Sequence, residues 1–98
     1  MTTITKKELV NRIAELTGVS RSETKKVVQT FLDLIIEELA KGNRLEFRDF
    51  GVFEVKLRKK RQAQNPKTLE KVIVPERKVV KFKEGRLMKL KVGEPTQT

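Results

Sequence analysis

The sequence predicts an α+β fold, in which two N-terminal helices precede an antiparallel sheet and a short C-terminal helix. Three observations support this prediction. The 98 residues suit one compact domain, apolar residues recur at helical spacing as far as residue 42, and from Asn43 their spacing changes to the two-residue period of strands. A domain of this size buries only about 60–65% of the surface that its unfolded chain exposes, so association with another chain is one way to stabilise it.

The two helices are predicted from the residues at their ends. Thr5 and Glu8 have the spacing of a capping box, in which the hydroxyl accepts a free backbone N–H of the first turn and the carboxylate reaches back to the cap. A second capping box begins at Ser20. Gly18 and Gly42 follow the two apolar patterns, and glycine readily adopts the left-handed conformation that ends a helix. We therefore expect the second helix to end near residue 40.

The later half of the second helix is apolar around more than one stripe. Its apolar residues are Val27, Val28, Phe31, Leu32, Leu34, Ile35, Ile36 and Leu39. A helix that packs on one small core needs only about a 100° apolar face. This helix is therefore either central to its own domain or also buried against a second subunit. We favour the second subunit, because the chain supplies few other elements to cover the helix.

Alternating apolar and charged residues predict three antiparallel strands. Residues 43–48 alternate in this way, and residues 53–58 do so again after a tight turn at residues 49–51. The last strand is expected at residues 79–82, where Val79, Val80 and Phe82 are apolar. The sequence thus predicts a three-stranded antiparallel sheet.

A long polar segment separates the second predicted strand from the third. Residues 58–71 contain little that could be buried, because only Ala63 and Leu69 are apolar. Strand character resumes at residues 72–74. A two-stranded ribbon without a core of its own is marginally stable in water. We expect a long β-ribbon arm over residues 58–75 that projects from the sheet.

The predicted elements form a single domain over residues 1–92. Leu87, Met88 and Leu90 lie on one side of a short amphipathic helix near the C-terminus. The expected parts are a helical dimerisation base (1–42), the sheet with its arm (43–83), the C-terminal helix (84–92) and a flexible tail (93–98).

Positive charge is concentrated in the second half of the chain. The formal net charge is +10 at pH 7. Residues 55–92 hold fourteen Lys and Arg against three acids, a net charge of +11, whereas the rest of the chain holds nine basic and ten acidic residues. This separation predicts a polyanion-binding surface rather than general solubility. The candidate partners are a nucleic acid, an anionic membrane or an acidic protein, and the composition favours a nucleic acid.

Several classes of chemistry are disfavoured by what the sequence lacks. The chain has no Cys and no His, which excludes disulfides and thiolate metal sites and removes the commonest general base and metal ligand. No apolar run approaches the roughly 18–20 residues of a membrane span, and the N-terminus has no signal-peptide core. We therefore expect an intracellular, soluble protein with no catalytic residues, metal, cofactor or small-molecule substrate.

The middle of the arm carries the dipeptide Asn65-Pro66. Asn-Pro is first of all a turn signal. The proline ring is also compact and apolar and has no N–H, so a proline at an exposed tip flanked by cations is suited to wedge between base pairs. The residues alone favour the simple turn and leave the wedge open.

Three motifs and two arginines, taken with their spacing along the chain, form a pattern that is specific for one protein family. They are Phe50-Gly51-Val52-Phe53-Glu54-Val55, then Arg58 and Arg61, then Asn65-Pro66-Lys67-Thr68, and finally Val79-Val80-Lys81-Phe82-Lys83. With these motifs nearly the whole chain, from about residue 5 to 92, resembles the histone-like HU and integration host factor family of bacterial DNA-bending proteins.

The resemblance implies an intertwined dimer whose helices form a base and whose sheets form a saddle, from which two arms wrap double-stranded DNA. It implies that Pro66 inserts into the minor groove and kinks the duplex. The implied DNA-binding residues are Lys6, Arg58, Lys59, Lys60, Arg61, Gln64, Asn65, Pro66, Lys67, Lys71, Lys81, Lys83, Arg86 and Lys89. The residues expected in the core or at the dimer interface are Phe31, Ile35, Leu39, Phe47, Phe50, Phe53 and Phe82. The implied function is largely sequence-independent DNA bending that organises the nucleoid in the bacterial cytoplasm.

Four positions depart from the family pattern. Asp49 and Leu69 stand where the family usually has glycine, and Ala63 replaces a further glycine of the arm. Gln64 replaces a cation next to the tip. An exposed Leu69 is itself a candidate for packing on the minor groove.

Alternatives to general DNA bending stay open. A site-specific protein like integration host factor would share every feature described above, and one chain does not distinguish a homodimer from a heterodimer with a paralogous subunit. An RNA-binding or ribosome-associated protein would also use a basic face, but it usually adds exposed stacking aromatics, and the chain has no Tyr or Trp. A membrane binder would need apolar residues along a basic helix, whereas the arm is a polar ribbon.

Overall fold

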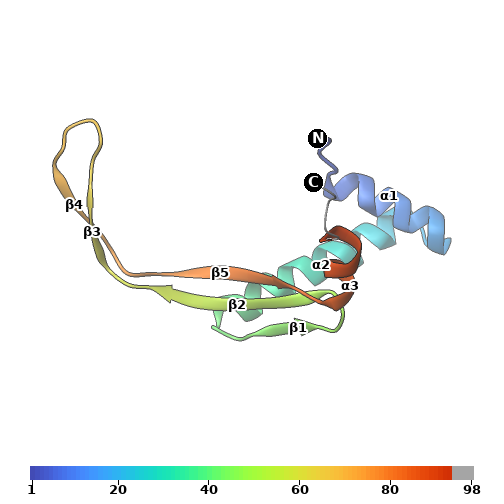
Figure 1. Cartoon of the computed structure of the whole chain (residues 1–98). Helices are drawn as coiled ribbons and strands as arrows, with labels where there is room; N and C mark the ends of the chain where they lie inside the picture. Colours follow the sequence, from blue (N-terminus) through green and yellow to red (C-terminus); the bar gives the residue numbers. More distant parts are fainter. Residues whose placement is uncertain (94–98) are drawn as a thin grey trace. The chain divides into compact units, whose positions relative to one another are not determined.

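A computed structural model describes residues 1–93 of the chain (Figure 1). The elements are α1 (Lys6–Thr17), α2 (Arg21–Ala40), β1 (Leu45–Phe47), β2 (Gly51–Arg58), β3 (Arg61–Gln64), β4 (Lys71–Val74), β5 (Arg77–Glu84) and α3 (Arg86–Val92). This order of helices and strands agrees with the α+β prediction. Residues 94–98, which make up most of the predicted flexible tail, lie outside the described residues.

The chain divides into two compact units, Met1–Glu37 and Glu38–Thr98. The boundary between them falls within α2, so the division into a base, a sheet and a C-terminal helix that the sequence suggested stays a prediction. None of the helices in the described part of the chain combines the length and the apolarity that a membrane span requires.

Helices α1 and α2 both begin at the predicted caps. The Thr5 hydroxyl accepts the Glu8 N–H at 3.4 Å, and the Ser20 hydroxyl accepts an N–H in the first turn of α2 at 3.2 Å. The Glu8 carboxylate is directed to Arg12 one turn later, at 3.2 Å, rather than back to the cap. Gly18 ends α1 in the left-handed conformation, with φ 75°, as the sequence predicted.

Few described side chains are buried within the single chain. Val10 and Ala14 of α1 and Thr24 of α2 are at most 8% exposed. Apolar residues of α2 are much more exposed to solvent: Val27 is 68% exposed and Phe31 is 51% exposed. A helix central to its own domain would bury these side chains. The single chain therefore leaves a broad apolar surface on α2 uncovered.

Strands β1, β2 and β5 form an antiparallel sheet in the order β1-β2-β5. The register places Phe53 opposite Phe82 and Glu54 opposite Lys81. Because successive side chains of a strand point to opposite faces, the sheet has one apolar face with the phenylalanines and one charged face with Glu54 and Lys81. This division into two faces positions the candidate site.

Close packing of aromatic rings organises the apolar face. The rings of Phe53 and Phe82 have centroids 4.8 Å apart, and Phe50 packs against Phe82 at 5.8 Å with its plane inclined by 61°. Gly51 lies beneath this cluster, since a Cβ there would overlap the Phe82 ring and lie 2.6 Å from the Lys83 carbonyl oxygen. The start of β2 is therefore restricted to glycine by the packing of Phe82.

The turn between β1 and β2 holds the N-terminus of α3. Asp49 has φ 65°, and its carbonyl accepts the Leu87 N–H at 3.0 Å. The Phe50 carbonyl accepts the Gly85 N–H at 2.7 Å. These bonds satisfy N–H groups at the start of α3 that the helix itself leaves free. They fix the C-terminal helix to the β1–β2 turn.

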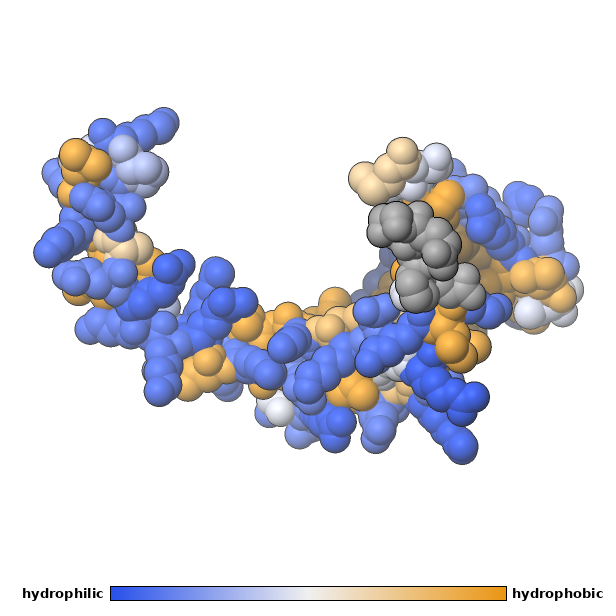
Figure 2. Space-filling view, viewed as in Figure 1, coloured by the Kyte–Doolittle hydropathy of each residue, from blue (hydrophilic) through white to orange (hydrophobic). Residues whose placement is uncertain are grey.

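The arm is a separate two-stranded antiparallel sheet formed by β3 and β4. Ala63 faces Val72, and Gln64 faces Lys71. The ribbon continues beyond the ends of β2 and β5 (Figure 1), and hydrophilic residues cover most of it (Figure 2). A ribbon arm is thus present as predicted, while its bounds at residues 58–75 stay a prediction.

The last strand is longer than the sequence indicated. β5 begins at Arg77 rather than at Val79, because Arg77 pairs with Arg58 and Lys78 with Leu57 of β2. Hydrophobic alternation does not reveal these pairs, since they consist mostly of charged residues.

Candidate nucleic-acid interface

The charged face of the β1-β2-β5 sheet leads directly into the arm. Along β2 it carries Glu54, Lys56 and Arg58, and the opposing residues of β5 include Lys81 and Arg77. Alternation along the strands puts these side chains on the face opposite the phenylalanines. Part of the positive charge predicted for residues 55–92 is thus gathered on one side of the sheet, where Lys56, Arg58, Arg77, Lys81 and Lys83 lie.

Glu54 is an acidic group within this cationic face. Its carboxylate lies 3.5 Å from Arg44 Nε and 4.0 Å from Lys83 Nζ, and its side chain is 20% exposed. The positive charges of the nearby Lys56 and of Lys83 lower the pKa of Lys81. Crowding of ammonium groups is electrostatically unfavourable in the free protein, and a bound polyanion relieves it.

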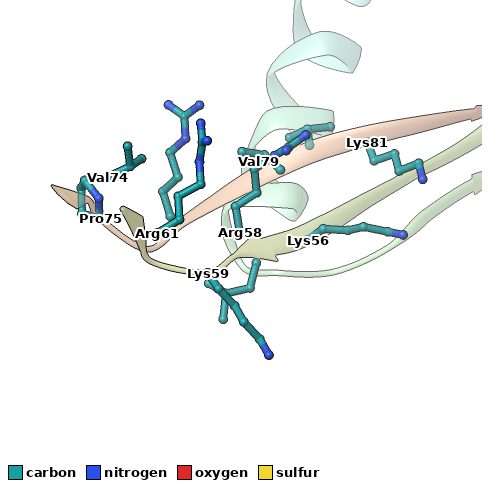
Figure 3. A pocket seen from close by; sticks show the side chains of 11 residues that line it. Lys56, Arg58, Lys59, Arg61, Val74, Pro75, Val79 and Lys81 are labelled. Carbon is teal, nitrogen blue, oxygen red and sulfur yellow. The ribbon is translucent and has the colours of Figure 1, made fainter. Parts of the chain in front are cut away.

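A hollow of about 680 Å³ lies at the root of the arm (Figure 3). Arg58 and Arg61 extend to one side of the ribbon, whereas Lys59 extends to the other. The hollow is lined by six cations and five apolar residues, namely Lys56, Arg58, Lys59, Arg61, Arg77 and Lys81 together with Leu57, Val74, Pro75, Val79 and Val80. The six cations of this hollow suit the phosphates of a nucleic acid, which Arg and Lys bind.

The fourteen predicted DNA-binding residues fall into four places. The ribbon and its tip hold Arg61, Gln64, Asn65, Pro66, Lys67 and Lys71; the sheet and the arm root hold Arg58, Lys59, Lys60, Lys81 and Lys83; α3 holds Arg86 and Lys89; and α1 holds Lys6. The hollow brings together Arg58, Lys59, Arg61 and Lys81. Lys6 lies in the N-terminal unit, where its ammonium group donates a hydrogen bond to the Gln29 side chain. The DNA contacts of all fourteen residues stay predictions.

Two cations of the hollow, Lys56 and Arg77, were absent from the predicted site. Lys56 precedes Arg58 by two residues, so strand alternation places the two on the same face. This spacing was a usable signal. Arg77 joins the site through its pairing with Arg58 across the β2–β5 register, and that pairing is not visible in the local sequence.

The arm tip is a loop of four residues, Pro66 to Leu69, closed by backbone hydrogen bonds. The Leu69 N–H donates to the Asn65 carbonyl at 2.7 Å, and the Asn65 N–H donates to the Glu70 carbonyl at 2.8 Å. The Asn65 side chain accepts the Lys67 N–H at 2.9 Å, which is the local bond of an Asx-turn. Asn65 thus holds the turn, while Pro66 is exposed at the tip.

Within residues 1–93, two non-glycine residues adopt the left-handed backbone conformation, Asp49 with φ 65° and Leu69 with φ 62°. Both stand where the resemblance led us to expect glycine. Aspartate tolerates this conformation because its short side chain can bond locally, whereas other L-residues are disfavoured by roughly 1–2 kcal/mol. The Gln64 side-chain amide donates to the Leu69 carbonyl at 3.2 Å. Leu69 is therefore the strained residue of the arm tip.

The seven residues expected in the core or at a dimer interface lie on α2 and on the apolar side of the sheet. None of them is buried within the described single chain. Phe31 and Phe50 are each 51% exposed. A core within one chain thus does not account for these side chains, and their place at a dimer interface stays a prediction.

Comparison with known proteins identifies the family. Residues 4–93 match the family described as "Bacterial DNA-binding protein". The chain belongs to this bacterial DNA-binding protein family. The DNA-binding protein HU of Thermotoga maritima is 43% identical over 89 residues, which are 91% of this chain and 99% of the relative. Integration host factor subunit alpha of Acinetobacter baumannii is 36% identical over 95% of each chain.

A solved structure of the same family confirms the fold. An Anabaena HU–DNA cocrystal structure matches this member of the bacterial DNA-binding protein family with a TM-score of 0.87 and 37% identity. The match covers 94% of this chain and 100% of the other. The predicted HU-like α+β fold and the resemblance to the HU and integration host factor family are therefore confirmed.

Proposed function

We propose that this chain is an architectural protein that binds double-stranded DNA through the minor groove and bends it, largely without regard to sequence. The observation that carries the proposal is the continuous cationic surface from the charged face of the sheet, through the hollow at the arm root, into the β3–β4 ribbon. The opposite face of the sheet is aromatic and apolar. This division assigns one face to phosphates and the other to protein.

The same division supports a dimer as the binding species. The aromatic face and the later half of α2 expose side chains that include Phe50 at 51% and Ile36 at 66%. Exposed apolar patches of this kind, on either element, mark protein–protein interfaces. We propose that two copies, or this chain and a paralogous subunit, cover these surfaces together. Sedimentation equilibrium tests this step, and a single-chain mass at micromolar concentration would contradict it.

Electrostatic contacts and deformation of the DNA contribute separately to the binding free energy. Lys and Arg release counterions from the phosphates and supply affinity for any sequence. Pro66 unstacks a base step at a cost on the order of a few kcal/mol, which the additional contacts of a bent duplex outweigh. Nicked or already bent DNA should therefore bind more tightly than straight duplex, because part of the deformation is already made.

A competition assay tests this function. The full-length protein is offered a linear duplex, a nicked duplex, a four-way junction and a structured RNA, each labelled, at several salt concentrations. We expect nicked and four-way DNA to bind most tightly, and log K to fall linearly with log salt at about 0.9 per neutralised phosphate. Preference for the RNA, or affinity that is insensitive to salt, would contradict the proposal.

Site-specific bending is the second candidate function, favoured by the similarity to integration host factor subunit alpha. A randomised duplex pool distinguishes the two, because enrichment of a motif indicates site selectivity and binding without a motif indicates general DNA bending. In either case we propose a non-enzymatic role on the nucleoid in the cytoplasm. The family to which the chain belongs is described as DNA-binding.

A further inference from the structure

We infer that Leu69 is a second apolar wedge at the arm tip, which enters the minor groove beside Pro66, and that Gln64 is its positioning residue. The inference rests on the proposed function, because it concerns how the arm contacts DNA. It adds a DNA-contacting residue at a position where the resemblance led us to expect glycine. It also gives Gln64 a role other than a direct phosphate contact.

The first observation is that Leu69 combines strain with exposure. Its φ of 62° lies in the left-handed region that a leucine rarely adopts. Its side chain is 68% exposed, so burial within the described chain does not compensate for the conformation. Strained residues persist where the surrounding structure holds them, and they are concentrated at ligand clamps and other functional sites.

The second observation is that Leu69 and Pro66 occupy the two ends of one short loop. The Leu69 N–H closes this loop on the Asn65 carbonyl at 2.7 Å. Two apolar side chains are thus presented at the tip of a ribbon that is otherwise mostly hydrophilic (Figure 2). Leucine and proline are both among the side chains that proteins insert between base steps in the minor groove.

The third observation is the bond that holds Leu69 in place. The Gln64 amide donates to the Leu69 carbonyl at 3.2 Å, across the end of the β3–β4 ribbon. This bond fixes the orientation of the peptide that follows Leu69 and favours the left-handed conformation.

Four variants of position 69 and its surroundings test the wedge. Leu69→Gly and Leu69→Asn both accept the left-handed backbone but remove the apolar side chain, whereas Leu69→Met keeps it. Ile73→Thr is the matched control, because Ile73 is an apolar residue of the ribbon that is 62% exposed but lies away from the tip. The readouts are the bend angle from energy transfer on an end-labelled duplex, and the Kd for nicked DNA.

We expect Leu69→Gly and Leu69→Asn to bind nicked DNA roughly tenfold more weakly, in line with the loss of one buried leucine side chain, and to bend it less. Leu69→Met and Ile73→Thr should behave like the wild-type protein. Unchanged bending by both polar and glycine variants would overturn the wedge. A loss in Leu69→Gly alone would also overturn it, because it would show that the loop conformation and not the apolar group is required.

A double-mutant cycle tests the positioning role of Gln64. If Gln64 acts through Leu69, then Gln64→Ala weakens bending in the wild-type protein and has little further effect in the Leu69→Gly background. Additive losses would overturn the positioning role and indicate that Gln64 contacts DNA directly. Failure of the wild-type protein to bind DNA at all would instead overturn the proposed function, so the two failures are distinguishable.

Discussion

Arg58 and Arg77 stand directly opposite each other in the antiparallel β2–β5 pair, so two positive charges face each other at the root of the arm. Like charges in this arrangement are destabilising, by an amount on the order of 0.2–1 kcal/mol. The surrounding hollow adds further cations, including Lys56 and Arg61. The sheet end that supports the arm is thus electrostatically unfavourable until a polyanion neutralises it.

Replacing one arginine of this pair should have opposite effects on stability and on binding. We expect Arg77→Gln to raise the free energy of unfolding at low salt by about 0.2–1 kcal/mol, because the repulsion with Arg58 is removed. The same variant should bind DNA more weakly. The slope of its log K against log salt should be less steep by about 0.9. Urea unfolding and fluorescence anisotropy measure the two effects. Lys7→Gln, an exposed change outside the site, should alter neither, and a less stable Arg77→Gln protein would contradict the argument.

Removing the tip proline should separate bending from folding. Pro66 is exposed, and the turn around it is held by Asn65 and by backbone bonds. We therefore expect Pro66→Ala to retain the wild-type circular dichroism spectrum and unfolding midpoint. Its bend angle on an end-labelled duplex should decrease, because the wedge that unstacks a base step is lost. Wild-type bending by this variant would contradict the wedge.

Adding a single methyl group to Gly51 should destabilise the sheet. A Cβ at this position would overlap the Phe82 ring and approach the Lys83 carbonyl oxygen to 2.6 Å. Overpacking of this kind typically costs about 1–3 kcal/mol. We expect Gly51→Ala to lower the urea midpoint at fixed protein concentration. The double variant Gly51→Ala/Phe82→Leu should recover part of the loss, since the carbonyl contact remains, and strictly additive losses would contradict this account.

A buried hydroxyl of α2 provides a stabilising change. Thr24 is 4% exposed, and within the described chain its Oγ1 atom has no hydrogen-bond partner. Replacing the hydroxyl with a methyl group of similar shape removes the desolvation penalty of an unsatisfied polar group, which is about 1–3 kcal/mol. We expect Thr24→Val to raise the unfolding midpoint. Thr30→Val on the exposed surface of the same helix is the control and should have little effect; a destabilised Thr24→Val protein would show that the hydroxyl is bonded.

The parts of the fold that depend on near neighbours could be predicted from the sequence. The caps at Thr5 and Ser20 act on N–H groups within one helical turn, and Gly18 and Gly42 both adopt the left-handed conformation at the helix ends. The ribbon could be placed because it has almost nothing to bury. The motif around Asn65-Pro66 then identified the family that the comparisons confirm.

The parts that depend on distant partners could not be predicted in the same way. Arg77 belongs to the site because β5 pairs with β2 in one particular register, and polar strand ends carry no periodic signal. The left-handed conformation of Leu69 could not be derived from its residue type, because leucine disfavours it. The apolar surface of α2 was predicted. Which of its side chains stay exposed in a single chain could not be predicted, because their exposure depends on the packing of the whole chain.

The separation of the β3–β4 ribbon from the β1-β2-β5 sheet has a consequence for how such a protein diverges. Substitutions in the ribbon alter little of the packing that stabilises the body, so they carry a small penalty in unfolding free energy. The angle and the sequence preference of a DNA bend can therefore drift rapidly while the body stays unchanged. The substitutions at Ala63, Gln64 and Leu69 are the kind of variation that this freedom permits.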